Sequence, residues 1–193
     1  MLGRKLILTS QGLNTRIGRT LIKREISRED LASKKIMLIF EPYFSIERIL
    51  IEAAKWMGFN EENIYLFHQG LAKDIIVKMD YIYVTEGNTF DILKGMRDAN
   101  IMDSIRKAYL NGTVYIGASA GAVIAGINVE VAREFDSLYN RDYDYGGLGL
   151  VNGIVIPHQS KESIKANFSP YAIEQLKKFD NVYTIDDEGI LVL

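Results

Sequence analysis

Short apolar runs typical of buried β-strands alternate with longer helical patterns along most of this chain. Residues 5–10 and 35–40 are the first two such runs, and residues 46–57 carry apolar side chains at helical spacing. Strands that alternate with helices need crossover connections, which favour a mostly parallel sheet covered by helices on both faces. The sequence therefore predicts a three-layer α/β fold with a mostly parallel central sheet.

The same patterns assign most of the chain to strands or helices. We expect strands at 5–10, 35–40, 63–67, 81–85, 113–118, 153–158, 181–185 and 190–193. We expect helices within 13–31, at 46–57, from 88 or 89 onward, at 101–110, from 120 onward, and at 163–179 with an irregularity near Pro170. Residues 133–150 have the composition of a loop.

Size and charge limit the class of protein. A chain of 193 residues fits a single domain spanning residues 1–193. A net charge of −2 without a basic tract argues against nucleic acid as a partner. The absence of cysteine excludes disulfides, thiolate catalysis and Cys-ligated zinc. The apolar run near the first residue is too short for a signal peptide or a membrane span, so we expect a cytoplasmic protein without membrane contact.

The segment "GASAG", residues 117–121, follows a predicted strand and precedes a predicted helix. It fits the G-x-S-x-G pattern, in which a serine occupies a strained turn and its neighbours must be small. The helix that begins there would direct the Ala120 N–H at an oxyanion beside Ser119. The alternative is a tight turn whose small residues only allow close packing. The setting favours a reactive Ser119.

A serine nucleophile needs a base, and the chain has two histidines. His158 follows "GIVIP" at the carboxyl end of the predicted strand 153–158, and His68 follows the predicted strand 63–67. Ligands of parallel sheets lie beyond the carboxyl ends of the strands, so either histidine could reach the same edge as Ser119. Local sequence does not choose between them.

Two further segments end predicted strands with polar residues. Asp186, Asp187 and Glu188 follow the strand at 181–185, where they could orient an imidazole or form a solvated turn. The loop "TEGNTF", residues 85–90, contains Gly87, which permits close backbone approach to a ligand. Asn88 or Thr89 could cap the helix that follows, and both are candidate substrate-binding residues.

With these pieces together, the chain resembles the peptidase E (S51) family of serine peptidases, which includes aspartyl dipeptidases and, more distantly, cyanophycinase. The resemblance rests on "LILTSQG", "YIYVTEGNTFDILK", "GTVYIGASAGAVIAG", "GLGLVNGIVIPH" and "IDDEGILVL". It implies a fold like that of class I glutamine amidotransferases, which is flavodoxin-like. The chemistry of those amidotransferases is excluded because it needs a cysteine.

The family's motifs fall on particular residues of this chain. The resemblance implies Ser119 as nucleophile and selects His158, the histidine after proline, as base. The acid falls on Asp187, or on Glu188 if the alignment shifts by one residue.

The family's glycine-rich loop implies a pair of oxyanion donors. The N–H groups of Gly87 and Ala120 match this pair. The chain departs from the family at Thr85 and Glu86, where the family usually has glycine. A carboxylate at position 86 would oppose an oxyanion if it pointed inward.

The resemblance implies hydrolysis of dipeptides or short peptides through an acyl-enzyme, with N-terminal aspartate as one candidate preference. No metal or organic cofactor is needed. The alternatives are a non-catalytic relative that binds a small ligand and an esterase of the α/β-hydrolase type. The oligomeric state stays open, with a homodimer as one option. Cations that could recognise an acidic substrate are Arg133, Arg141, Lys161 and Lys165.

Overall fold

The structure is a computed structural model and describes residues 5–26, 30–41, 46–67, 73–138 and 143–193. Its centre is a six-stranded sheet in the order β3-β2-β4-β5-β1-β8. The strands are β1 (Leu6–Thr9), β2 (Ile36–Ile39), β3 (Ile64–Leu66), β4 (Tyr81–Val84), β5 (Val114–Ala118) and β8 (Ile190–Val192). Neighbouring strands run parallel, except that β8 is antiparallel to β1.

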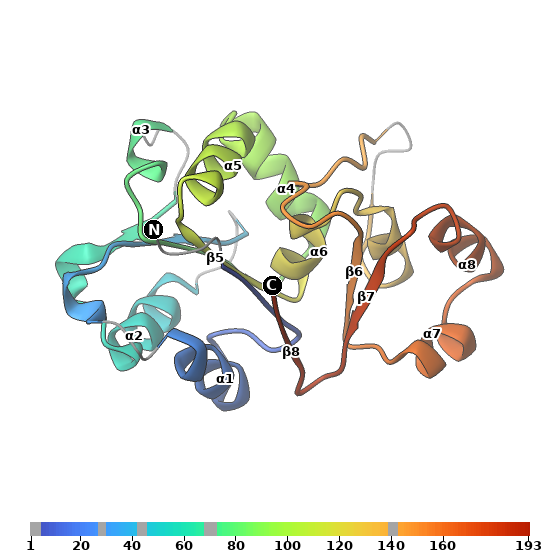
Figure 1. Cartoon of the computed structure of the whole chain (residues 1–193), viewed down its shortest axis with the longest axis horizontal. Helices are drawn as coiled ribbons and strands as arrows, with labels where there is room; N and C mark the ends of the chain where they lie inside the picture. Colours follow the sequence, from blue (N-terminus) through green and yellow to red (C-terminus); the bar gives the residue numbers. More distant parts are fainter. Residues whose placement is uncertain (1–4, 27–29, 42–45, 68–72, 139–142) are drawn as a thin grey trace.

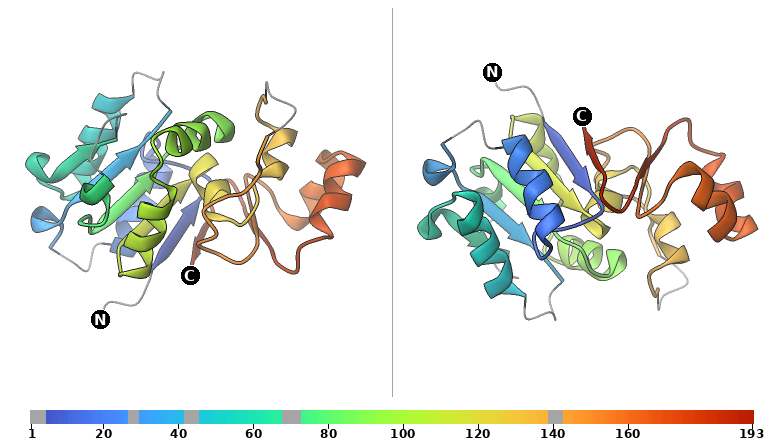
Figure 2. Two further views of the ribbon diagram at one scale, coloured as in Figure 1. Left: turned by 90° about the horizontal axis from the view of Figure 1, so that it is seen from above. Right: turned by 90° about the horizontal axis from the view of Figure 1, so that it is seen from below.

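Helices cover both faces of this sheet (Figures 1 and 2). On one face lie α1 (Arg16–Ile26), α2 (Glu47–Met57) and the short 3₁₀ helices η1 (Leu31–Ser33) and η2 (Glu61–Asn63). On the other face lie α3 (Lys73–Ile76), α4 (Thr89–Asp98), α5 (Met102–Leu110) and α6 (Ala120–Ala125). Every residue of β1, β2 and β4 is buried, as expected for parallel strands enclosed on both sides. The predicted three-layer α/β fold is confirmed.

A separate two-stranded sheet stands beside the first. It pairs β6 (Ile154–Pro157) with β7 (Val182–Ile185) in parallel, with Pro157 opposite Ile185. The 3₁₀ helix η3 (Glu130–Glu134) and the helices α7 (Lys161–Asn167) and α8 (Pro170–Leu176) lie at this end of the molecule (Figure 1). The strands expected at 153–158 and 181–185 are therefore present, but they do not extend the central sheet.

Two sequence predictions need correction in detail. The single helix expected at 163–179 is two helices, because Pro170 has no N–H to continue a helix and instead occupies the first turn of α8. Ser169 caps that helix by accepting a hydrogen bond from the Ala172 N–H at 3.2 Å. The expected helix within 13–31 is shorter and forms α1.

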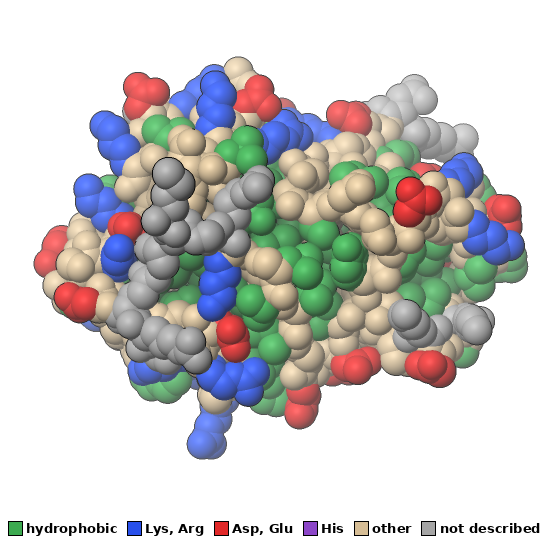
Figure 3. Space-filling view, viewed as in Figure 1, with side chains coloured by type: hydrophobic (Ala, Val, Ile, Leu, Met, Phe, Trp, Pro, Cys, Tyr) green, Lys and Arg blue, Asp and Glu red, His purple; other side chains and the backbone are tan. Residues whose placement is uncertain are grey.

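Charged side chains are unevenly spread over the face in Figure 3. They gather at the margins, while hydrophobic side chains occupy the middle of this face, over α6 and β8. Within the described residues, none of the helices combines the length and the apolar character that crossing a membrane requires.

Candidate active site

Ser119 occupies a strained turn between β5 and α6. Its backbone φ is 47° and its ψ is −108°, a combination that side-chain-bearing residues rarely adopt. The strand ends at Ala118 and the helix begins at Ala120, so the turn consists of the serine alone.

Two glycines make the turn sterically feasible. A Cβ on Gly121 would lie 2.1 Å from the Val84 carbonyl oxygen, and a Cβ on Gly117 would lie 2.5 Å from the Gly121 oxygen. Both distances are too short for any larger residue. The Gly121 N–H donates to the Thr85 carbonyl at 3.1 Å, which ties the first turn of α6 to the end of β4. The small residues of the pattern thus hold strand, helix and neighbouring strand together.

His158 reaches Ser119 from the second sheet. It follows Pro157, the last residue of β6, and its Nε2 lies 3.1 Å from Ser119 Oγ. Its Nδ1 lies 2.7 Å from Asp187 Oδ1. In the tautomer with its proton on Nδ1, the imidazole donates to the Asp187 carboxyl group and presents the Nε2 lone pair to the serine hydroxyl. The three side chains form a continuous hydrogen-bonded chain.

The turn between β7 and β8 supplies the carboxylate. The Gly189 N–H donates to the Asp186 carbonyl at 2.8 Å and closes this turn. The sequence did not decide whether Asp187 or Glu188 is the acid. In the structure Asp187 contacts the imidazole of His158. The side chains of His158 and Asp187 are 40% and 70% exposed, so the chain of hydrogen bonds lies at the surface, where a substrate can reach it.

Two backbone N–H groups, one directly after Ser119 and one in the loop that follows β4, have no partner among the described residues. They belong to Gly87, in the loop after β4, and to Ala120, the first residue of α6. Gly87 has a φ of 135°, and a Cβ there would lie 2.8 Å from Glu41 Oε2. This position therefore requires glycine. Unengaged N–H groups at such a turn are the usual donors of an oxyanion hole.

A sequence model described as Peptidase family S51 matches residues 49–193, about three quarters of the chain. The chain belongs to this family. Peptidase E of Haemophilus influenzae strain Rd is 30% identical over 147 residues, which cover 74% of this chain and 66% of that protein. Peptidase E of Actinobacillus pleuropneumoniae is 29% identical over 155 residues, which cover 78% of this chain and 64% of that protein. The chain thus spans less than two thirds of the length of these relatives.

Solved structures show the same fold as this S51 chain. A crystal structure of a candidate peptidase E protein from Listeria monocytogenes EGD-e has a TM-score of 0.73 at 22% identity, covering 98% of this chain and 94% of that one. A crystal structure of a peptidase from an acI-B1 Actinobacterium has a TM-score of 0.68 at 18% identity, covering 100% of this chain and 84% of that one.

The loop that carries Gly87 in this S51 chain is held by two carboxylates that the sequence did not single out. Glu41 Oε2 accepts from the Asn88 N–H at 3.1 Å, and Asp136 Oδ2 accepts from the Thr89 N–H at 2.9 Å. Burial raises the pKa of Asp136, and the hydrogen bond from the Thr89 N–H opposes that shift. Each carboxylate lies 47 residues from its partner in the chain, so no local pattern could have indicated it.

The Asn88 side chain uses its polar groups within the protein, whereas the buried Thr89 hydroxyl has no hydrogen-bond partner among the described residues. Asn88 Oδ1 caps α4 by accepting from the N–H groups of Phe90 and Asp91, and its Nδ2 donates to the Ser137 carbonyl. Thr89 is fully buried. The Asn88 side chain and the Thr89 N–H therefore hold the loop, and the predicted substrate contacts of these two residues stay a prediction.

Glu86 is turned toward the segment between β1 and α1. Its Oε2 accepts from the Tyr83 hydroxyl at 3.2 Å, and that hydroxyl accepts from the Leu13 N–H at 2.9 Å. A Cβ on Gly12 would lie 1.7 Å from Glu86 Oε2, so the carboxylate packs directly under this glycine. Burial raises the pKa of Tyr83 far above its usual range, and the nearby Glu86 adds to the shift. Tyr83 packs on the α1–α2 face of the sheet, whereas α6 lies on the other face.

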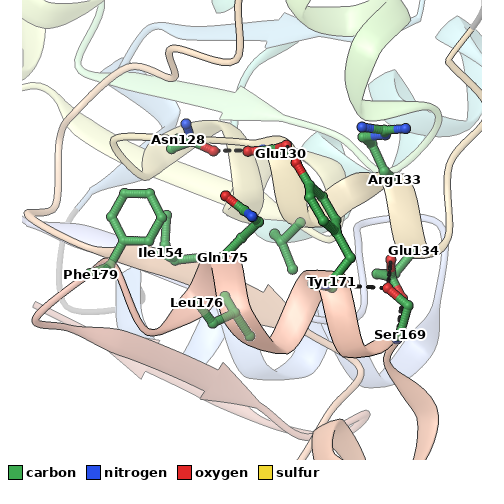
Figure 4. A pocket seen from close by; sticks show the side chains of 12 residues that line it. Asn128, Glu130, Arg133, Glu134, Ile154, Ser169, Tyr171, Gln175, Leu176 and Phe179 are labelled. Atoms are coloured by element: carbon green, nitrogen blue, oxygen red, sulfur yellow. Dashed lines mark hydrogen bonds between the residues drawn. The ribbon is translucent and has the colours of Figure 1, made fainter.

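Among the remaining sequence candidates, Arg133 is the one whose side chain the structure describes, and it lies away from Ser119. Arg133 lies at the edge of a cavity of about 200 Å³ between η3, the start of β6 and α8 (Figure 4). Glu134 closes part of this cavity by accepting from the N–H and the hydroxyl of Ser169. The cavity adjoins Ile154, whereas His158 follows the other end of β6. His68 and Arg141 lie outside the described residues, as do the side chains of Lys161 and Lys165.

Proposed function

We propose that this chain is a serine peptidase that cleaves dipeptides or short peptides through an acyl-enzyme. The observation that carries the proposal is the hydrogen-bonded chain from Ser119 through His158 to Asp187, which we call the triad. Membership of family S51 supports the same chemistry. In this proposal Asp187 holds the imidazole and stabilises its charged form, as the third member of such triads does.

Acylation would follow from this arrangement. His158 Nε2 takes the proton of the Ser119 hydroxyl while Oγ forms a bond to the carbonyl carbon of the substrate. The carbonyl oxygen becomes an oxyanion that accepts hydrogen bonds from the N–H groups of Gly87 and Ala120. The C–N bond then breaks, and the imidazolium gives its proton to the leaving amine.

Deacylation uses the same groups with water as the nucleophile. Water attacks the acyl carbon while His158 Nε2 takes one of its protons. The C–O bond to Ser119 breaks as the oxyanion collapses, the carboxylic acid leaves, and the proton returns to Ser119 Oγ. No other reactant is required.

The order of the three residues along the chain is Ser119, His158, Asp187. In α/β-hydrolases the acid precedes the histidine, so the esterase alternative does not fit this arrangement. The alternative of a non-catalytic ligand binder would leave Ser119 without reactivity, which the following experiment measures.

A fluorophosphonate probe tests the proposal, because it reacts only with an activated serine. We expect one label per chain, on Ser119, which is lost in Ser119→Ala. The matched control Ser104→Ala, a serine on α5, should label like the wild type. Absence of labelling in the folded wild-type chain, under conditions that label a known serine hydrolase, would favour the binder alternative. A panel of dipeptides with and without N-terminal aspartate then defines the substrate.

A further inference from the structure

We propose that Ser10 is a positioning residue of the site, whose buried hydroxyl couples the backbone of His158 to the strand that leads to Asp187. This inference rests on the proposed function, because positioning matters only if His158 acts on Ser119. Ser10 follows the last residue of β1 and is 2% exposed.

One hydroxyl makes two hydrogen bonds here. Ser10 Oγ donates to the Ile185 carbonyl at 2.9 Å and accepts from the His158 N–H at 2.9 Å. A hydroxyl has a single proton, so the donation to Ile185 leaves its lone pairs free to accept from the histidine. The hydroxyl therefore acts as both donor and acceptor. Its two hydrogen bonds join the end of β1 to the ends of β6 and β7.

His158 depends on this support because its backbone is unusual. Its φ is 62°, in the left-handed region that side-chain-bearing residues seldom occupy. Such conformations persist only when the surroundings over-determine them. The hydrogen bond from the His158 N–H to Ser10 is a direct constraint on that conformation, and the conformation sets where the imidazole points.

The same strand end also holds the nucleophile. The Ser119 N–H donates to the Thr9 carbonyl at 2.8 Å, one residue before Ser10. Thr9 and Ser10 therefore fix the backbones of Ser119 and His158 relative to each other, across the junction between the two sheets. The Ile185 carbonyl also accepts from the Gln159 N–H at 3.2 Å, and Asp187 follows two residues later.

If the Ser10 hydroxyl only stabilises the fold, Ser10→Ala should lower the free energy of unfolding and leave the reactivity of Ser119 unchanged. Positioning predicts that Ser10→Ala also slows attack by Ser119, since an error of about 1 Å in a reacting group can cost about 10²-fold in rate. Thr113→Val is the matched control. Thr113 is 6% exposed, its hydroxyl donates to the Met79 carbonyl at 2.7 Å, and it precedes β5 at the end opposite Ser119.

The test measures fluorophosphonate labelling of the wild type and both variants, well below their melting temperatures. For Ser10→Ala we expect the maximal labelling rate to fall about 10–100-fold while half-saturation changes less than about threefold. Thr113→Val should lose similar stability and label at the wild-type rate. If Ser10→Ala does not fold, Ser10→Cys, which keeps a weaker donor and acceptor, should give an intermediate rate.

The outcomes separate the two proposals. Wild-type labelling together with an unchanged maximal rate in folded Ser10→Ala or Ser10→Cys overturns the positioning role and leaves the proposed function standing. An equal loss in Thr113→Val also overturns it, because the effect would then follow stability alone. An unlabelled wild type overturns the proposed function, and the positioning role with it.

Discussion

Ser119 and His158 share a backbone property that their neighbours lack. Both have positive φ, and among the described residues the only other non-glycine with this property is Asn100, which follows α4. The G-x-S-x-G pattern predicted the strained serine, because a serine held between a strand and a helix in so tight a turn needs small neighbours. Nothing in the sequence around His158 indicates that its backbone is left-handed. That conformation depends on Ser10, which is 148 residues away.

The choice of acid is a second matter that the sequence left open. Asp187 and Glu188 are adjacent and equally suited by residue type, and their order in the turn decides which one faces β6. The prediction that His158 rather than His68 serves Ser119 came from the resemblance and not from local sequence. Its geometric basis is now the 3.1 Å approach of Nε2 to the serine hydroxyl.

The adjacent acids give a matched pair of variants. Asp187→Asn should lower the rate of fluorophosphonate labelling about 10³–10⁴-fold, because the amide no longer favours the tautomer with its proton on His158 Nδ1. Glu188→Gln, which removes the neighbouring charge, should label within about twofold of the wild type. A larger loss in Glu188→Gln than in Asp187→Asn would mean that the acid has been misassigned.

At the scale of elements, the loop after β4 contains Asn88, which both begins α4 and holds the loop that carries Gly87. The sequence predicted a helix beginning at Asn88 or Thr89, and Asn88 is its N-cap. The same side chain reaches Ser137, while Glu41 and Asp136 hold the neighbouring N–H groups. These three contacts leave the Gly87 N–H unengaged and its loop fixed. These contacts join residues far apart in the chain. The sequence pattern therefore predicted the Asn88 cap but not the contacts with Glu41, Asp136 and Ser137.

Two helix caps allow the loop to be tested. Asn88→Ala and Ser169→Ala each remove an N-cap, and each should cost about 1 kcal/mol of stability, or roughly 2–4 °C in Tm. Only Asn88→Ala should also slow fluorophosphonate labelling, by about tenfold or more, because it frees the loop that carries the Gly87 N–H. Equal labelling rates in the two variants would show that the Asn88 cap does not govern the reactive geometry.

At the scale of the whole molecule, the proposed triad bridges two sheets. Ser119 follows β5 of the six-stranded sheet, whereas His158 and Asp187 follow the strands of the two-stranded sheet. The alternation of strands and helices predicted the large sheet, because crossover connections permit few other arrangements. The alternation could not predict that β6 and β7 form a separate sheet, because the pattern of apolar residues in a strand does not determine which other strand it pairs with.

The two sheets should differ in local stability. Isolated two-stranded sheets are marginal, and three of the four residues of β7 are only half-buried, whereas every residue of β4 is buried. We therefore expect amide exchange to be faster in β7 than in β4. In a urea titration, labelling of Ser119 should be lost before the far-UV circular dichroism of the bulk helices. Coincident transitions would show that the two sheets open as one unit.

The most direct test of the central claim is the mass spectrum of the wild-type chain after fluorophosphonate treatment, followed by peptide mapping. The account predicts one adduct per chain, located on Ser119, and its disappearance in both Ser119→Ala and His158→Ala. A folded chain that takes up no label, or that carries its label on another serine, would contradict the assignment of Ser119 and His158 as a nucleophile and its base.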